Sequence, residues 1–277
     1  MKIVDISTVV VNARMRNWIF VKVQTDVAGL HGWGEATLEW KTQAVIGCIE
    51  DLKPMLVGRD PVRIEFLWQI LYRHSFFRLG IIGMTAISGI EQACWDVLGK
   101  SLGVPVCQLL GGRVRDKVRM YTHLGGGESK SVYESFEIGS ITDRAMAVLE
   151  QGYSALKVVF VPYSRPLEGA RAIQHLAGLM KDLRRAVGDD VDLMLDFHGR
   201  TTTGQAIQYI RAIEEFHPLF CEEPVPPENA DALLEVRRSV SVPLATGERL
   251  VTRWEFRRLC EFARRNLLRS QIRKRNR

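Results

Sequence analysis

The sequence predicts an α/β protein: a (β/α) barrel of the TIM type, incomplete at about five of eight strands, that follows an N-terminal α+β domain. Two observations carry this prediction. The first part of the chain holds strand patterns and then helix patterns, whereas the later part alternates strand, loop and helix. Three apolar strand patterns of the later part also end in an acid at one interval, because Asp196, Glu222 and Glu248 are separated by 222 − 196 = 26 and 248 − 222 = 26 residues.

The N-terminal domain is predicted from strand and helix signals that do not alternate. Residues 2–10 and 18–25 are rich in β-branched residues and predict strands, and the Gly-rich stretch AGLHGWGEAT is typical of turns in an antiparallel meander. Helical periodicity follows in Thr42–Leu56, Pro61–Tyr72 and Met84–Leu102. A sheet followed by helices favours an α+β unit that is separate from the barrel.

The barrel is predicted to begin at KVRMYTH, whose mouth end lies near Thr122 and His123 and is followed by the loop GGGESKS. Ser140 is the expected cap of the next helix, and Gly152 is its expected stop. The other predicted elements are a strand at Ala155–Phe160, strands ending at the three acids, and helices at Ser140–Leu149, Leu167–Val187, Ala206–Ile213 and Ala230–Arg238.

The three acids are predicted to form a metal site. The carboxyl ends of successive strands meet at one mouth of a parallel barrel, so Asp196, Glu222 and Glu248 would repel one another unless a cation lay between them. Mg²⁺ fits best, because it is a hard ion that prefers carboxylate oxygens and keeps waters for substrate. One such acid alone would be interpreted as a solvated loop residue, and it is the equal spacing of three that favours a metal.

Strand alternation places further side chains around these acids. Side chains two apart on a strand share a face, so Met194, Asp196 and His198 are expected on one side and the residues between them on the other. His198 would therefore lie beside the metal. Glu223 faces the opposite way from Glu222, and we expect it to pair with a neighbour rather than bind the ion.

The motifs DFHGR, CEEPVPPEN and TGERL, at these spacings, resemble the enolase superfamily in its mandelate racemase and muconate lactonizing branch, and are most similar to sugar-acid dehydratases of the galactonate dehydratase type. The resemblance covers residues 1 to about 258. It implies a barrel whose mouth is capped by the N-terminal domain. It also implies chemistry in which a Lys or His base works with Mg²⁺ on an ene-diolate.

For the reaction, the resemblance implies a hydro-lyase acting on a small-molecule sugar acid, an aldonate. Mg²⁺ on Asp196, Glu222 and Glu248 would bind the substrate carboxylate and stabilise the ene-diolate formed as the α-proton leaves. His198 would be the catalytic general acid for the departing 3-hydroxyl, which gives a 2-keto-3-deoxy acid. A racemase, an epimerase or a dehydratase of another carboxylic acid remains the alternative within the superfamily.

Several residues are candidates for substrate binding. The loop Ala13–Trp18 of the capping domain would close over substrate. Its residues Arg16, Asn17 and Trp18 are candidates for binding a carboxylate or hydroxyls, although Trp18 also suits a packed core position. Trp40 is a weaker candidate in the same domain. His123 is a candidate at the end of the first barrel strand, with a solvated loop histidine as the alternative.

Lys157 lies in a predicted barrel strand, where a lysine is costly to bury without a partner. It is a candidate contact for a substrate carboxylate or an ion-pair partner for the metal acids. Related racemases carry two lysines in this strand, separated by one residue, and use the second as a base. The second position here is Val159, which weakens a two-base racemase interpretation.

Charge and composition argue against other classes of protein. The net charge is +6, but residues 249–277 carry 11 − 2 = +9, which leaves 6 − 9 = −3 for the rest of the chain and no general signal for nucleic acid. No apolar run approaches the roughly 20 residues that span a bilayer, and the N-terminus lacks the layout of a signal peptide, which predicts a cytoplasmic protein with no membrane partner. The 5 cysteines lack metal or disulfide spacing and predict reduced, buried thiols.

The repeat fails after WEFRRLCEF, and the expected domains are 1–115 for the cap, 116–258 for the partial barrel with the metal site, and 259–277 for a basic aberrant tail. We interpret the tail as the product of a truncated or frame-shifted gene. In the family, a base histidine lies on the seventh strand, which would fall beyond residue 277 and leave an impaired enzyme. An inactive remnant with a nucleic-acid-binding tail is the alternative from another class. The open sheet edge of a partial barrel predicts a homo-oligomer.

Overall fold

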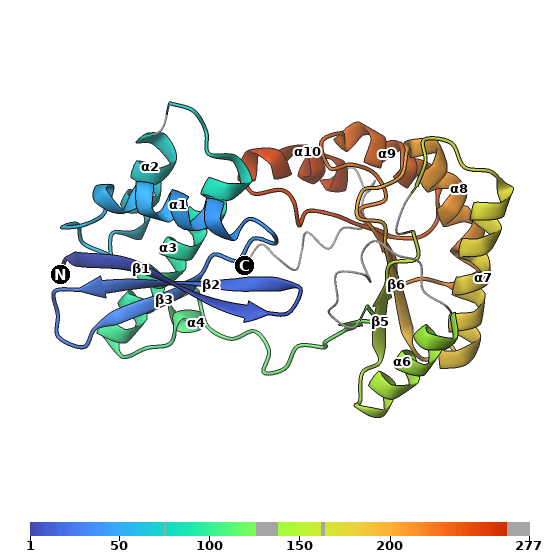
Figure 1. Ribbon diagram of the computed structural model, residues 1–277, viewed down its shortest axis with the longest axis horizontal. Coiled ribbons are helices and arrows are strands. Elements are labelled where there is room, and N and C mark those ends of the chain that lie inside the picture. Colours follow the sequence, from blue (N-terminus) through green and yellow to red (C-terminus); the bar gives the residue numbers. More distant parts are fainter. Residues whose placement is uncertain (75, 126–137, 162–163, 265–277) are drawn as a thin grey trace. The chain divides into compact units, whose positions relative to one another are not determined.

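The computed structural model describes residues 1–74, 76–125, 138–161 and 164–264, and Figure 1 shows its helices and strands. The chain divides into two compact units, Met1–Lys117 and Val118–Arg277. No helix within the described ranges is long and apolar enough to cross a membrane. Of the predicted GGGESKS loop only Gly125 is described, and most of the predicted basic tail also lies outside the described residues.

The first unit is an antiparallel three-stranded meander with helices packed against it (Figure 1). Its strands pair in the order β1-β2-β3, and α3 contacts both β2 and β3. The elements are β1 (Ile3–Ala13), β2 (Arg16–Thr25), β3 (His31–Glu35), α1 (Thr42–Leu52), the 3₁₀ turn η1 (Lys53–Met55), α2 (Ile64–His74), α3 (Gly80–Leu102) and α4 (Val106–Leu109).

Two alternate glycines of β3 explain how closely α3 packs on the sheet. A Cβ on Gly32 would clash with the carbonyl oxygen of Ala93, and a Cβ on Gly34 would clash with that of Gly89. A side chain at either strand position would therefore push the helix off the sheet. The glycines in HGWGE, taken from the sequence as turn signals, lie inside a strand and set the distance between sheet and helix.

Three boundaries in the first unit differ from the prediction. The expected loop Ala13–Trp18 is almost entirely strand, because β1 and β2 are joined by the two residues Arg14 and Met15, and Arg14 has a φ of 61°. The first helix ends at Leu52 and continues as η1, where Pro54 removes a backbone donor that an α-helix would need. The third helix begins at Gly80, four residues before the predicted Met84.

The second unit is a parallel five-stranded sheet whose strands lie side by side in chain order, β4-β5-β6-β7-β8. A helix follows each of these strands in the chain, and this alternation confirms the predicted α/β architecture. The elements are β4 (Thr122–His123), α6 (Ile138–Glu150), β5 (Ala155–Val158), α7 (Ala170–Val187), β6 (Asp192–Asp196), α8 (Thr203–Ile213), the 3₁₀ turn η2 (Glu214–Phe216), β7 (Phe220–Glu222), α9 (Ala230–Ser239), β8 (Leu244–Ala245) and α10 (Arg253–Arg264).

The two faces of the sheet carry the alternation that the sequence predicted. Leu193, Leu195 and Phe197 are buried in a large cluster with residues of the surrounding helices. Met194 faces the other way, in a small cluster with Ala155, Phe220 and Ala245. Figure 1 shows α6, α7 and α8 along one side of β5 and β6, which is the side of the large cluster. The small cluster and the predicted acids therefore share the face turned away from the helices.

Helix starts and one strand in the second unit differ from the prediction. Of the strand predicted at KVRMYTH, only Thr122–His123 forms β4. Ser140 lies inside α6, which begins at Ile138, so it is not the N-cap. Gly152 follows α6 with a φ of 91°, as expected of a helix stop. The helix predicted from Ala206 begins at Thr203, where Thr202 and Gln205 form a reciprocal capping box that the sequence analysis missed.

The cysteines follow the prediction only in part. Cys94 and Cys221 are buried, whereas Cys48 and Cys107 are partly exposed and Cys260 is exposed. The expectation of buried thiols is therefore wrong for Cys260, which lies on the outer face of α10. All five are free thiols.

Candidate active site

Two of the predicted acids meet at the carboxyl ends of β6 and β7. Asp196 and Glu222 are register partners, so the parallel pairing places their side chains next to each other. Lys157 reaches them from β5: its Nζ lies 2.7 Å from Asp196 Oδ2 and 2.9 Å from Glu222 Oε2. The exposed fractions of the three side chains are 12% for Lys157, 2% for Asp196 and 10% for Glu222. One buried ammonium thus bridges two buried carboxylates.

The charges of this group depend on one another. Burial by itself would lower the pKa of Lys157, but the negative charges of Asp196 and Glu222 and their hydrogen bonds outweigh it and raise that pKa. Lys157 is therefore fully protonated at neutral pH. The ion-pair role considered for Lys157 is present in the structure, and two carboxylates share its charge.

Glu248, the third predicted acid, lies near the other two but not at a strand end. Strand β8 ends at Ala245, and Gly247 turns the chain with a φ of 121° before Glu248. Burial, and then the negative charges of Glu223, Asp196 and Glu222, raise the pKa of Glu248 to about 7. Within the described ranges, no three His, Cys, Asp or Glu side chains stand in an arrangement that could hold a metal ion. Lys157 rather than Glu248 thus lies between Asp196 and Glu222, and Glu248 is repelled by the charges of both.

His198 lies beside Asp196 because of a turn rather than strand alternation. It has a φ of 51°, its backbone N–H donates to Asp196 Oδ1 at 3.0 Å, and its Nε2 lies 3.6 Å from Asp196 Oδ2. The same carboxylate therefore orients the backbone of His198, and its other oxygen lies near the ring. Burial lowers the pKa of His198, although the charge of Asp196 opposes this.

His123 also belongs to this group, so the interpretation as a solvated loop histidine is wrong. It is half-buried on β4 and is the register partner of Lys157. Its Nδ1 accepts a hydrogen bond from the N–H of Gly125 at 2.9 Å. Burial and the positive charge of Lys157 lower the pKa of His123 to about 4, so the ring is neutral at neutral pH.

Glu223 pairs with a neighbour, as predicted, and the partner is Arg249. Arg249 Nε donates to Glu223 Oε2 at 2.6 Å, and the Glu223 side chain is 0% exposed. Glu223 has a φ of 39°, so a left-handed backbone rather than strand alternation turns its side chain away from Glu222. A pair of opposite charges therefore lies immediately behind the acids.

Arg249 is a residue of the site that was not predicted, although the spacing of the sequence contains a signal for it. Glu223 and Arg249 are 249 − 223 = 26 residues apart, which is the interval between Glu222 and Glu248. Each of the two residues directly follows one of these acids in the sequence. Opposite charges separated by this interval are the signal that could have suggested the pair.

The structure describes the candidate substrate contacts Asn17, Trp18 and Trp40 of the first unit. Asn17 lies on β2, donates from Nδ2 to Thr42 Oγ1 at 3.3 Å and accepts from Asn12 at 3.1 Å. Trp18 is 46% exposed, so the alternative of a packed core residue is wrong. Trp40, the weaker candidate, is also exposed. Substrate binding by these residues stays a prediction.

Comparison with known proteins identifies the family. The model of the mandelate racemase / muconate lactonizing enzyme N-terminal domain matches residues 4–111, and the enolase C-terminal domain-like model matches residues 140–269. A crystal structure of a member of the enolase superfamily from Salmonella Typhimurium superimposes with a TM-score of 0.86 at 32% identity, covering 96% of this chain and 72% of that one. The chain belongs to the enolase superfamily.

Two named relatives and a further structure show which members of the enolase superfamily this chain is similar to. The D-galactonate dehydratase of Xanthomonas euvesicatoria pv. vesicatoria (strain 85-10) is 42% identical over 241 residues, which are 87% of this chain and 60% of that protein. The D-galactonate dehydratase of Verminephrobacter eiseniae (strain EF01-2) is 39% identical over 259 residues, 94% of this chain and 64% of that protein. An enolase from Pantoea ananatis with bound D-gluconate and Mg matches with a TM-score of 0.81 at 28% identity, covering 96% of this chain and 69% of that one.

Two facts about length accompany this membership. The chain spans about 60% of the length of the curated relatives it matches. The C-terminal family model extends to residue 269, which is beyond residue 258, where the resemblance was expected to end. The likeness to the superfamily thus includes part of the segment interpreted from the sequence as an aberrant tail.

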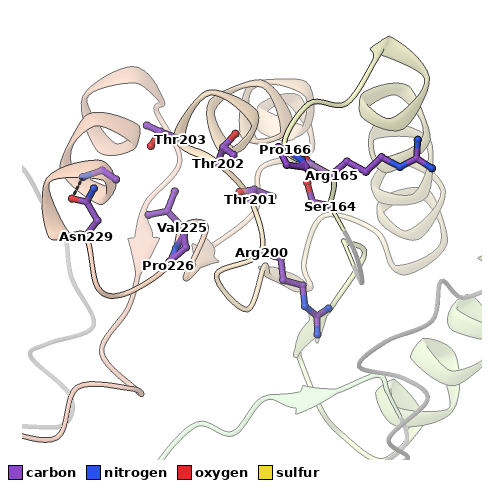
Figure 2. A pocket seen from close by; sticks show the side chains of 11 residues that line it. Ser164, Arg165, Pro166, Arg200, Thr201, Thr202, Thr203, Val225, Pro226 and Asn229 are labelled. Carbon is purple, nitrogen blue, oxygen red and sulfur yellow. Dashed lines mark hydrogen bonds between the residues drawn. The ribbon is translucent and has the colours of Figure 1, made fainter.

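A separate cavity of about 370 Å³ lies among the loops that follow β5, β6 and β7. Figure 2 shows that the guanidinium groups of Arg165 and Arg200 extend away from the other lining side chains. The remaining lining consists of hydroxyl and apolar side chains and the amide of Asn229, and none of the acids of the candidate site contributes to it. The lining residues are Ser164, Arg165, Pro166, Arg200, Thr201, Thr202, Thr203, Val225, Pro226, Asn229 and Ala232.

Proposed function

We propose that this chain carries the cation-binding and proton-donating part of an acid-sugar dehydratase, a Mg²⁺-dependent hydro-lyase acting on an aldonate such as galactonate. The observation that carries the proposal is the buried ammonium of Lys157 that Asp196 and Glu222 share, together with the electrostatic coupling of Glu248 to both acids. Support also comes from the relatives named D-galactonate dehydratase and from the related structure with bound D-gluconate and Mg.

The donor set fits Mg²⁺ in its chemistry. Three carboxylates supply hard oxygen donors, and two of them, Asp196 and Glu222, share the ammonium of Lys157 where they meet. Asp196, Glu222 and Glu248 are the residues that would hold the ion, and Lys157 would have to move aside for it. A bound Mg²⁺ supplies positive charge that stabilises negative charge on a carboxylic acid substrate as its α-proton leaves.

The residues of the chain have distinct tasks in this proposal. His198, whose Nε2 lies 3.6 Å from Asp196 Oδ2, carries the proton that the 3-hydroxyl takes as its C–O bond breaks and water departs. Loss of the α-proton and of this hydroxyl gives a 2-keto-3-deoxy acid. Lys157, released from the acids, is placed to bind the substrate carboxylate. His123, which is neutral and borders Lys157, is a substrate contact in this proposal, as are Asn17 and Trp18.

The first test measures cation and substrate binding. Mg²⁺ is expected to raise the melting temperature of the 277-residue chain, and Asp196→Asn is expected to abolish that rise. Galactonate should then bind only in the presence of Mg²⁺, whereas galactose, which has no carboxylate, should not bind. Equal Mg²⁺ responses of the wild type and Asp196→Asn would overturn the proposal.

The second test separates dehydration from the other reactions of the superfamily. A panel of aldonic acids is incubated with the chain and Mg²⁺, and the products are identified. A 2-keto-3-deoxy acid supports a dehydratase, whereas an epimer of the substrate identifies a racemase or epimerase. The homo-oligomer and the cytoplasmic location stay predictions from the sequence.

A further inference from the structure

The ion pair of Glu223 and Arg249 joins the loop that follows Glu222 to the loop that carries Glu248. Glu223 directly follows Glu222, and Arg249 directly follows Glu248. Their contact, Arg249 Nε to Glu223 Oε2 at 2.6 Å, is therefore a cross-link between the loop after β7 and the loop after β8. Strand pairing alone leaves Glu248 free to move, because β8 ends three residues before it.

The same pair also reaches the turn that carries His198. The N–H of Gly199 donates to the carbonyl oxygen of Glu223 at 2.7 Å. Gly199 has a φ of 65°, and a Cβ at this position would clash with Arg249 Nη2. The guanidinium is thus packed directly on the backbone of the residue after His198. The loop after Glu222, the loop that carries Glu248 and the turn that carries His198 therefore converge on a single guanidinium–carboxylate contact.

The pair is monodentate, although both groups are capable of two hydrogen bonds. Glu223 Oε1 and Arg249 Nη2 are buried and find no hydrogen-bond partner among the described residues. A pair built only for stability at this depth would be expected to satisfy both atoms. The position of the guanidinium instead fixes the distance between two loops, because Arg249 lies between the Glu223 carboxylate and the Gly199 backbone.

We infer that Glu223 and Arg249 are positioning residues that set the affinity of the acid cluster for a divalent cation. They do so by fixing the strand end at Glu222, the loop of Glu248 and the turn of His198 relative to one another. This inference rests on the proposed function, since it assumes that the acids bind such an ion. Residues that contact metal ligands orient those ligands, and removing such a residue commonly weakens metal binding by about 10- to 100-fold.

The test uses Mg²⁺ alone as the probe, in calorimetric titrations of the 277-residue chain and its variants. Arg249→Met is expected to weaken Mg²⁺ binding by about 10- to 100-fold. Glu223→Gln keeps the shape of the side chain and should give a smaller loss. Because the two residues act as one contact, the double variant should lose little more than Arg249→Met alone. Additive losses, or none, would contradict the inference.

A matched control separates positioning from general stability. Arg184 is also partly buried and also ties loops together, through the carbonyl oxygens of Phe216, Gly188 and Val191, but it does so before β6 and β7 rather than after them. Arg184→Met should lower the melting temperature in metal-free buffer and leave the Mg²⁺ affinity unchanged. If Arg184→Met weakens Mg²⁺ binding as much as Arg249→Met does, the effect is a general loss of stability and the inference fails.

Two further outcomes are distinguished by the same titrations. If Arg249→Met does not fold, Arg249→Lys keeps the charge and should bind Mg²⁺ less tightly than the wild type while melting near it. Wild-type affinity in every variant at positions 223 and 249, with loss in Asp196→Asn, would overturn this inference and leave the proposed function standing. Equal binding by the wild type and Asp196→Asn would overturn both.

Discussion

The Nζ of Lys157 lies 2.7 Å from Oδ2 of Asp196, and both side chains are almost fully buried. Because the same ammonium also contacts Glu222, the positive charge at the centre of the cluster belongs to the protein itself. A buried pair of like charges is unstable without such a partner. The balance of charge in this cluster therefore governs both the stability of the fold and the affinity for a cation.

Replacing Lys157 tests this balance. Lys157→Met should lower the free energy of unfolding in metal-free buffer by about 3–5 kcal/mol, because it leaves two buried carboxylates without a counter-ion. Mg²⁺ should recover more stability in this variant than in the wild type. The comparison is Lys53→Met, which removes an exposed ion pair with Asp5 and should cost about 1 kcal/mol or less. Urea unfolding with and without Mg²⁺ measures both, and similar costs at the two positions would contradict the account.

Glu248→Gln is expected to have opposite effects on stability and binding. Burial and three neighbouring acids disfavour the charge of Glu248, so the neutral amide should raise the melting temperature in metal-free buffer. The same change removes a hard, charged donor and should weaken Mg²⁺ binding. Thermal melts at pH 8, where Glu248 is mostly ionised, give the first result, and titration with Mg²⁺ gives the second. A variant that loses stability without the metal would show that Glu248 has a favourable partner.

The first unit offers a pH test that is independent of the acid cluster. Burial raises the pKa of Glu91, and the hydrogen bond from Trp95 opposes this only in part. A raised pKa in the folded state means that the stability contributed by Glu91 is complete below its ordinary pKa and is lost as the pH rises through the raised value. Glu91→Gln should therefore melt higher than the wild type at pH 7, with the difference disappearing near pH 4. A difference that does not change with pH would rule out ionisation as the cause.

Packing of α3 on β3 is tested at a glycine. Gly34→Ala should lower the free energy of unfolding by about 1–3 kcal/mol or more, because its Cβ would clash with the backbone oxygen of Gly89. The matched variant is Gly47→Ala in α1, where nothing lies within 4 Å of the new Cβ. That change should stabilise the protein by about 0.5–1 kcal/mol through helix propensity. Chemical denaturation measures the free energy of unfolding of both variants. Equal effects would show that helix and sheet are not in close contact.

Much of the second unit follows from local pattern. The alternation in residues 192–197 predicts which side chains face the helices, and it does so correctly because a strand admits only two faces. The 26-residue interval predicts that Asp196 and Glu222 meet, because units of equal length return the chain to neighbouring strands in the same register. Helix starts were predicted less well, since caps such as Thr202 precede the apolar periodicity that reveals a helix.

The sequence by itself determined the family, the order of the parallel strands and the positions of Asp196 and Glu222 at their carboxyl ends. The tertiary structure decided how the charges are paired: Lys157 between Asp196 and Glu222, Arg249 against Glu223, and Glu248 held on a loop instead of a strand end. Left-handed backbone at His198 and Glu223 turns both side chains in directions that strand alternation does not give. Such pairings depend on turn geometry and on side chains from separate units meeting in space, and neither is encoded in the periodicity of a single segment.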